Sequence, residues 1–73
     1  MRLFNRRYKV VFKFPYRSDA DRVSLFLASR GVKTKRTKDS GFDHRVKCWF
    51  EDVEDFKGSI NIIVKSGIAI GIV

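Results

Sequence analysis

Residues 8–14 read YKVVFKF and decide the fold, because two sets of side chains alternate along them. One face of the stretch is wholly apolar or aromatic and consists of Tyr8, Val10, Phe12 and Phe14. The other face is mostly basic and consists of Arg7, Lys9, Val11 and Lys13. Such alternation predicts a half-buried strand with one wet face. Pro15 ends the strand, since proline has no N–H to give to a sheet.

The same pattern returns 36 residues later, so the chain has two halves of similar outline. The shift places Val10, Phe12 and Phe14 on Val46, Cys48 and Phe50, and it places Leu27 on Ile63 and Gly31 on Gly67. An even shift preserves which strand residues share a face. Each half therefore predicts a strand, a helix, a glycine stop and a second strand.

In the first half, we expect a helix over 18–30. Ser18 is the expected N-cap, with Asp21 three residues on, and Gly31 is the expected C-terminal stop. A second strand is expected over 32–37. It should form a hairpin with a third strand over 45–51, through a loop near 38–43 that contains Asp-Ser-Gly.

The last third of the chain leaves two interpretations open. Apolar residues at helical spacing, an acidic start at Asp52 and Gly67 as a stop indicate a helix that includes residues 59–65. Gly58 and the β-branched residues that follow it favour a strand at 59–65 instead. The repeat supports the helix because it involves several positions at once. In either case a final strand is expected over 68–73.

The predicted fold class is α+β, with a ferredoxin-like split βαβ plan (βαββαβ) in one domain spanning 1–73. Its four-stranded antiparallel sheet would have the order 4-1-3-2, with both helices on one face and an open basic face. The alternative is βαββ followed by a C-terminal β-hairpin.

The charge is strongly basic and unevenly distributed. Sixteen Lys and Arg against eight Asp and Glu give a net charge of +8. Residues 1–17 carry six basic and no acidic side chains, whereas 51–73 carry two basic and four acidic ones. This asymmetry indicates a polyanionic partner.

The predicted open face combines cations with one indole, which suits phosphates and an unpaired base. We expect a weakly sequence-specific, backbone-led nucleic-acid site, with single strands slightly preferred because of Trp49. Its candidate residues are Arg7, Lys9, Lys13, Lys33, Lys35, Arg45, Lys47 and Trp49. The plan resembles that of RNA-recognition-motif domains, which bind RNA on this sheet face. Residues 44–50 lack the glycine-aromatic signature of those domains, so membership is not inferred.

No catalytic or metal-binding motif is present in the sequence. The single cysteine, Cys48, is expected to be a core thiol, and the single histidine, His44, has no identifiable orienting partner. We therefore expect no enzyme, no cofactor and no metal. With no signal peptide and no long apolar run, a cytoplasmic protein with no membrane partner is expected.

A second class of function remains open, that of a small protein-binding adaptor or inhibitor. The apolar tail places Ile68, Ile70 and Ile72 on a predicted edge strand. Such an edge favours pairing with another chain, either in a homodimer or with a different protein. Small size and basic composition would also suit a regulator from a virus or mobile element.

Overall fold

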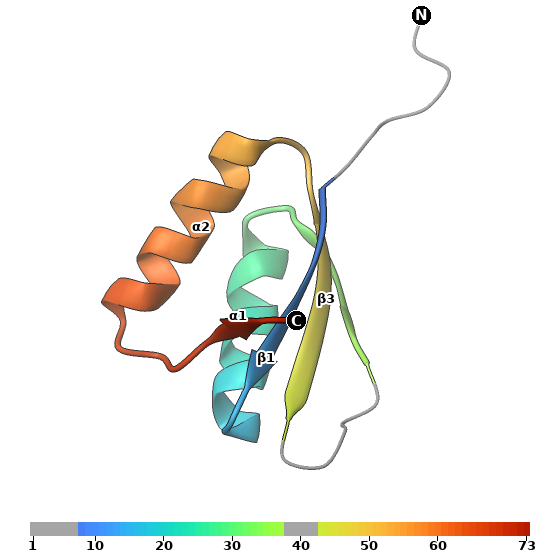
Figure 1. The fold of residues 1–73 in the computed structure, drawn as a ribbon. Coiled ribbons are helices and arrows are strands. Elements are labelled where there is room, and N and C mark those ends of the chain that lie inside the picture. The colour runs from blue at the N-terminus through green and yellow to red at the C-terminus, as the bar shows by residue number, and fades with distance from the viewer. Residues whose placement is uncertain (1–7, 38–42) are drawn as a thin grey trace, which may run out of the picture.

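A four-stranded antiparallel sheet and two helices make up the structure, a computed structural model that describes residues 8–37 and 43–73 (Figure 1). The strand order is β2-β3-β1-β4, which reads 4-1-3-2 from the opposite edge. The arrangement is compatible with a ferredoxin-like plan. In chain order the elements are β1 (Tyr8–Phe14), α1 (Arg17–Ser29), β2 (Lys33–Arg36), β3 (His44–Phe50), α2 (Val53–Lys65) and β4 (Gly71–Ile72).

The central pair of strands is β1 and β3, and their register runs from Tyr8 opposite Phe50 to Phe14 opposite His44. This register places the apolar positions of the two strands on the same face. Phe12, Phe14, Val46, Cys48 and Phe50 on that face have no exposed surface. The period-two pattern in the sequence therefore becomes one wall of the core.

The other wall of the core comes from the two helices, which lie on the same side of the sheet (Figure 1). Ala20, Val23 and Leu27 of α1 are buried, and α2 contributes Ile63 and Ser59. Phe56 of α2 stacks against Phe12 with ring centroids 6.3 Å apart, and its ring meets the edge of Phe50 at 5.5 Å. Aromatic contacts thus connect α2 to the sheet.

Residues 59–65 are helical, so the repeat was the better guide and the strand interpretation is wrong. The first turn explains why α2 forms despite its β-branched residues. The side chain of Asp52 accepts a hydrogen bond from the backbone N–H of Asp55 at 2.8 Å, and acidic residues occupy the helix start. Gly67 follows with φ 81°, a conformation that glycine adopts without strain.

The boundaries of four elements differ from expectation. Helix α1 begins at Arg17, its N-cap is Tyr16, and no side chain caps it, so the Ser18 cap is wrong. Strands β2 and β3 span 33–36 and 44–50, each within one residue of the expected ends. The largest difference is β4, which has only Gly71 and Ile72 in place of a strand over 68–73.

The last strand is short because few of its residues pair with β1. Ile68 and Ile70 lie before it and pack against the hydrophobic core. The ladder to β1 is limited to Phe12 opposite Ile72 and Lys13 opposite Gly71, with a further bond from the N–H of Val73 to the carbonyl of Val11. Neither helix among the described residues is long and apolar enough to cross a membrane.

Candidate nucleic-acid interface

The open sheet face is organised in cross-strand rows that follow directly from the two registers. In the first row Trp49 lies between Lys33 of β2 and Lys9 of β1. In the second row Lys47 lies between Lys35 and Val11. In the third row Arg45 lies opposite Lys13. Rows are separated by two residues along each strand, about 7 Å, and neighbouring strands by about 5 Å.

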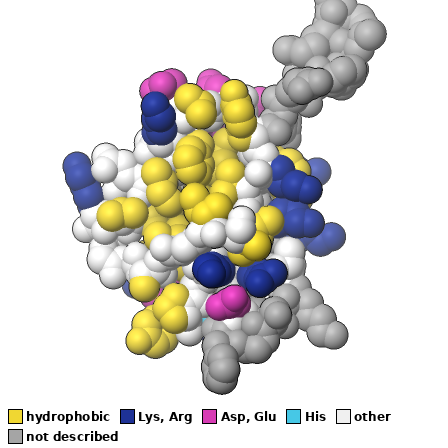
Figure 2. All heavy atoms as spheres, in the orientation of Figure 1, with side chains coloured by type: hydrophobic (Ala, Val, Ile, Leu, Met, Phe, Trp, Pro, Cys, Tyr) yellow, Lys and Arg dark blue, Asp and Glu magenta, His cyan; other side chains and the backbone are white. Residues whose placement is uncertain are grey.

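Seven of the eight predicted site residues are brought together in this way, and the eighth, Arg7, lies outside the described residues. Lys9 and Lys13 of β1 and Lys33 and Lys35 of the edge strand β2 are exposed. Side chains of the central strand β3 are half-buried between them. Figure 2 shows Lys and Arg side chains projecting together at the right, on the sheet side.

The face carries charge of one sign. At the outward positions of the four described strands there are six cations and no carboxylate. Lys35 lies directly opposite Lys47, and Lys13 directly opposite Arg45. Like charges that face each other across a sheet cost roughly 0.2–1 kcal/mol per pair. A ligand that neutralises them removes this cost.

Trp49 has a neighbour that the sequence did not suggest. The ammonium of Lys33 lies over the Trp49 ring, 5.4 Å from its centroid, within the usual range of a cation–π contact. Since the two residues are directly opposite in the β2–β3 register, the contact follows from strand pairing. The side-chain pattern within a single strand does not predict this contact between two strands. The half-buried state of Trp49 thus has a local cause within the sheet.

Arg45 and Lys13 are held by contacts at the end of the face. A guanidinium nitrogen of Arg45 lies 3.6 Å from a carboxylate oxygen of Asp43. The stem of Lys13 passes over Gly71, where a Cβ atom would come within 3.0 Å of it. Gly71 therefore allows the lysine stem to lie across β4, and this close approach was also missed by sequence reasoning.

Arg36, the last residue of β2, lies on the opposite side of the sheet. It forms an ion pair with Asp21 of α1, and its Nε donates to the carbonyl of Arg45 at 3.2 Å. These contacts tie the edge strand to the first helix. Arg36 consequently adds stability to the fold and no charge to the open face.

The cysteine and the acidic residues after β3 make contacts that belong to the fold. Cys48 is buried, its thiol donates to the carbonyl of Val10 at 3.5 Å, and burial raises its pKa from 9.0 to about 12. A thiol so protonated is a poor nucleophile at neutral pH. The acidic residues after β3 serve α2: Asp52 caps it, and Asp55 lies 3.9 Å from Arg30 of α1.

The predicted partner edge is not assembled as expected. Ile68 and Ile70 pack against the core, and only Ile72 of the three is exposed and in β4. An edge of two paired residues offers few free backbone groups for adding another strand. The apolar surface of the molecule lies instead on the helix side, where apolar side chains gather in the middle of Figure 2.

Fold and site together define a small α+β protein with a cationic, tryptophan-bearing sheet face opposite a helix layer of balanced charge. Each helix carries two basic and two acidic residues. Comparisons with protein-family models, with curated proteins and with solved structures gave no match.

Proposed function

We propose that this protein is a non-enzymatic nucleic-acid-binding module of ferredoxin-like fold that uses its basic sheet face. The observation that carries the proposal is the register, which gathers Lys9, Lys33, Lys35, Lys47 and Trp49 on one surface, with no carboxylate at the outward positions of the described strands. Phosphates neutralise such a surface and release counterions, which gives affinity without sequence choice. A cytoplasmic location forms part of the same proposal.

Single strands are favoured over duplexes because of the row Lys33–Trp49–Lys9. A base that stacks on the indole would have an ammonium group on either side for its flanking phosphates. The lysine that covers the ring in the free protein is flexible and can turn to a phosphate when a base takes its place. Stacking on an aromatic residue is worth roughly 1–3 kcal/mol per base.

The test is an anisotropy titration of labelled single- and double-stranded DNA and RNA between about 50 and 200 mM salt. Emission of Trp49, the one tryptophan in the chain, is followed in parallel. We expect a steep fall of affinity with salt, and quenching of Trp49 by single strands alone. Absence of binding at the lowest salt would overturn the proposal, and steep salt dependence without quenching would remove the stacking step from it.

Two variants of equal net charge distinguish binding at the sheet face from attraction by the overall charge of the protein. Lys9→Glu with Lys47→Glu alters the sheet face, whereas Lys57→Glu with Lys65→Glu alters α2 on the other side. We expect the first pair to weaken binding about tenfold or more at low salt and to reduce the salt slope by about two. The second pair should have a much smaller effect. Equal losses in both variants would contradict a face-specific site.

A further inference from the structure

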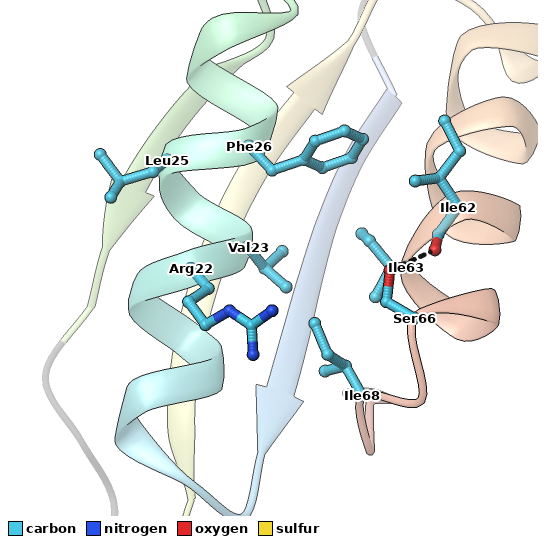
Figure 3. A pocket seen from close by; sticks show the side chains of 8 residues that line it. All are labelled: Arg22, Val23, Leu25, Phe26, Ile62, Ile63, Ser66 and Ile68. Carbon is cyan, nitrogen blue, oxygen red and sulfur yellow. Dashed lines mark hydrogen bonds between the residues drawn. The ribbon is translucent and has the colours of Figure 1, made fainter.

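A groove lies between the two helices, on the side of the molecule away from the basic face. Its volume is about 480 Å³, and α1, α2 and the segment before β4 all contribute to its lining. In Figure 3, Phe26 extends from α1 toward α2, and Ile62, Ile63 and Ile68 lie on the opposite side. The hydroxyl of Ser66 donates to the carbonyl of Ile62 at 2.9 Å, so it is already satisfied.

The groove exposes apolar surface on both of its walls. Ile62 of α2 is 42% exposed, and Phe26 of α1 extends toward it, while the side chain of Leu25 at the rim, 73% exposed, points away from α2 (Figure 3). Beneath them Val23 and Ile63 are buried and form its deeper part. Apolar side chains in a contiguous, hollowed patch are typical of a surface that binds another molecule.

The shape of the groove favours a helix as its occupant. Sites for small molecules enclose most of the ligand, about 70–90% of its surface, and a wall residue as exposed as Ile62 does not. A strand would need free backbone groups, but the lining comes from two helices and a connecting segment. The lining residues lie within 22–26 of α1 and 62–66 at the end of α2, about 7 Å along each helix, so the groove can take one or two apolar side chains of a helix that lies across it.

The charge of the groove selects among possible helices. Of the described residues that line it, only Arg22 is charged. Its side chain is 69% exposed, and its guanidinium reaches the space between α1 and Ile68 (Figure 3). Among the described residues its carboxylate partner is Asp19, whose side chain is 17% exposed and lies 3.8 Å away, a long contact for an ion pair. Arg22 can therefore exchange this partner for a carboxylate on an incoming helix.

We propose that the groove between α1 and α2 binds an amphipathic helix of a partner protein, with an apolar face for the groove and an acidic residue for Arg22. A second copy of this chain is a less suitable occupant, because it brings a net charge of +8 to a chain of the same charge. An acidic helix gains from the same long-range field. The proposal does not depend on nucleic-acid binding by the sheet face.

Two designed peptides of about 15 residues probe the groove in solution. Both have leucines at i, i+3, i+4 and i+7, and they differ only in carrying Glu or Lys beside that stripe. We expect the Glu peptide to bind the full chain about tenfold more tightly than the Lys peptide. Arg22→Glu should reverse this order. Equal affinities, or an order that Arg22→Glu leaves unchanged, would overturn the proposal.

Matched variants locate the binding. Ile62→Glu should weaken the Glu peptide about tenfold or more, whereas Val64→Glu should not, because Val64 is 56% exposed on the same helix but outside the groove lining. The Lys9→Glu, Lys47→Glu variant should retain the peptide. Loss of the peptide in that variant would assign it to the sheet face and refute a groove site. Sedimentation equilibrium of the free chain provides a further test, since a dimer dissociated by Ile62→Glu would make a second copy the occupant.

Discussion

The two halves of the chain have the same outline but different means of holding their helices. A shift of 36 residues carries β1 onto β3 and α1 onto α2 with identical bounds, and it carries Gly31 (φ 83°) onto Gly67 (φ 81°). Yet α1 buries three apolar residues and has no side-chain cap, while α2 buries Ile63 and a serine and is capped by Asp52. Two helices with the same bounds in the repeat are therefore stabilised differently, α1 mainly by packing and α2 also by a hydrogen bond at its N-cap.

This difference also accounts for the groove. Val23 of α1 is the counterpart of Ser59 in α2, and Phe26 is the counterpart of the exposed Ile62. With less apolar surface directed at the sheet, α2 leaves part of its own apolar side to the solvent. The groove therefore lies where this side of α2 faces α1, and residues of both helices line it.

The largest expected effects come from truncating the equivalent core residues Leu27 and Ile63, which are 0% and 2% exposed. Large-to-alanine changes in cores cost about 2–5 kcal/mol. We expect Leu27→Ala near the upper end, because α1 packs directly on the sheet. Ile63→Ala should fall near the lower end, since Ile63 lines the groove and the vacated space opens to it.

Urea denaturation followed by circular dichroism measures both variants. Leu25→Ala serves as the control, because Leu25 is mostly exposed and should change the free energy of unfolding little. A larger loss for Ile63→Ala than for Leu27→Ala would contradict the view that α1 is the more firmly packed helix.

The next effect concerns the two N-caps, Tyr16 and Asp52, which are also 36 residues apart. Both have extended backbones, but only Asp52 accepts a hydrogen bond, from the N–H of Asp55. Asp52→Ala should lower the free energy of unfolding by about 1 kcal/mol. Tyr16→Asp should raise it by about 0.5–1 kcal/mol, because it supplies the missing cap at a residue that is 62% exposed.

Thermal unfolding checks this reciprocal pair. Tyr16→Ala is the control that removes the ring without supplying an acceptor. If Tyr16→Ala stabilised the protein as much as Tyr16→Asp, the gain would come from loss of the ring, and the capping explanation would be wrong.

Two kinds of signal predicted the elements well: the alternation within a strand and the repeat between the two halves of the chain. Alternation in residues 8–14 sets the bounds of β1, and the repeat identifies α2 even though Gly58 and its β-branched neighbours oppose a helix. Ser18 was mistaken for a cap because Tyr16 already has the extended backbone of that position. Local patterns place a cap only to within a residue or two.

Predictions about the surface depended on contacts between residues that are far apart in the sequence. Strand alternation was enough to collect the lysines of the open face, once the register was known. It did not reveal that Lys33 covers Trp49, nor that β4 is limited to Gly71 and Ile72. The groove depends on how two helices sit apart on one sheet, and single-segment periodicity contains no information on that spacing.

The smallest expected effect is at Ser59, the polar counterpart of Val23. Ser59 has no exposed surface, and among the described residues its hydroxyl has no hydrogen-bond partner. A buried hydroxyl without a partner loses its bond to water on folding. Ser59→Ala removes that cost and places a better helix former in α2, so the free energy of unfolding should rise by about 0.5 kcal/mol.

Ser66→Ala is the matched control on the same helix, because the hydroxyl of Ser66 does have a partner in the carbonyl of Ile62. It should lower stability slightly or leave it unchanged. Urea denaturation compares the two variants, with one m-value shared in the fits so that a shift of the midpoint reports a change in the free energy of unfolding. If Ser59→Ala were the more destabilising of the two, Ser59 would be making an interaction that holds α2 to the sheet, and the contrast between the helices would be smaller than their buried residues indicate.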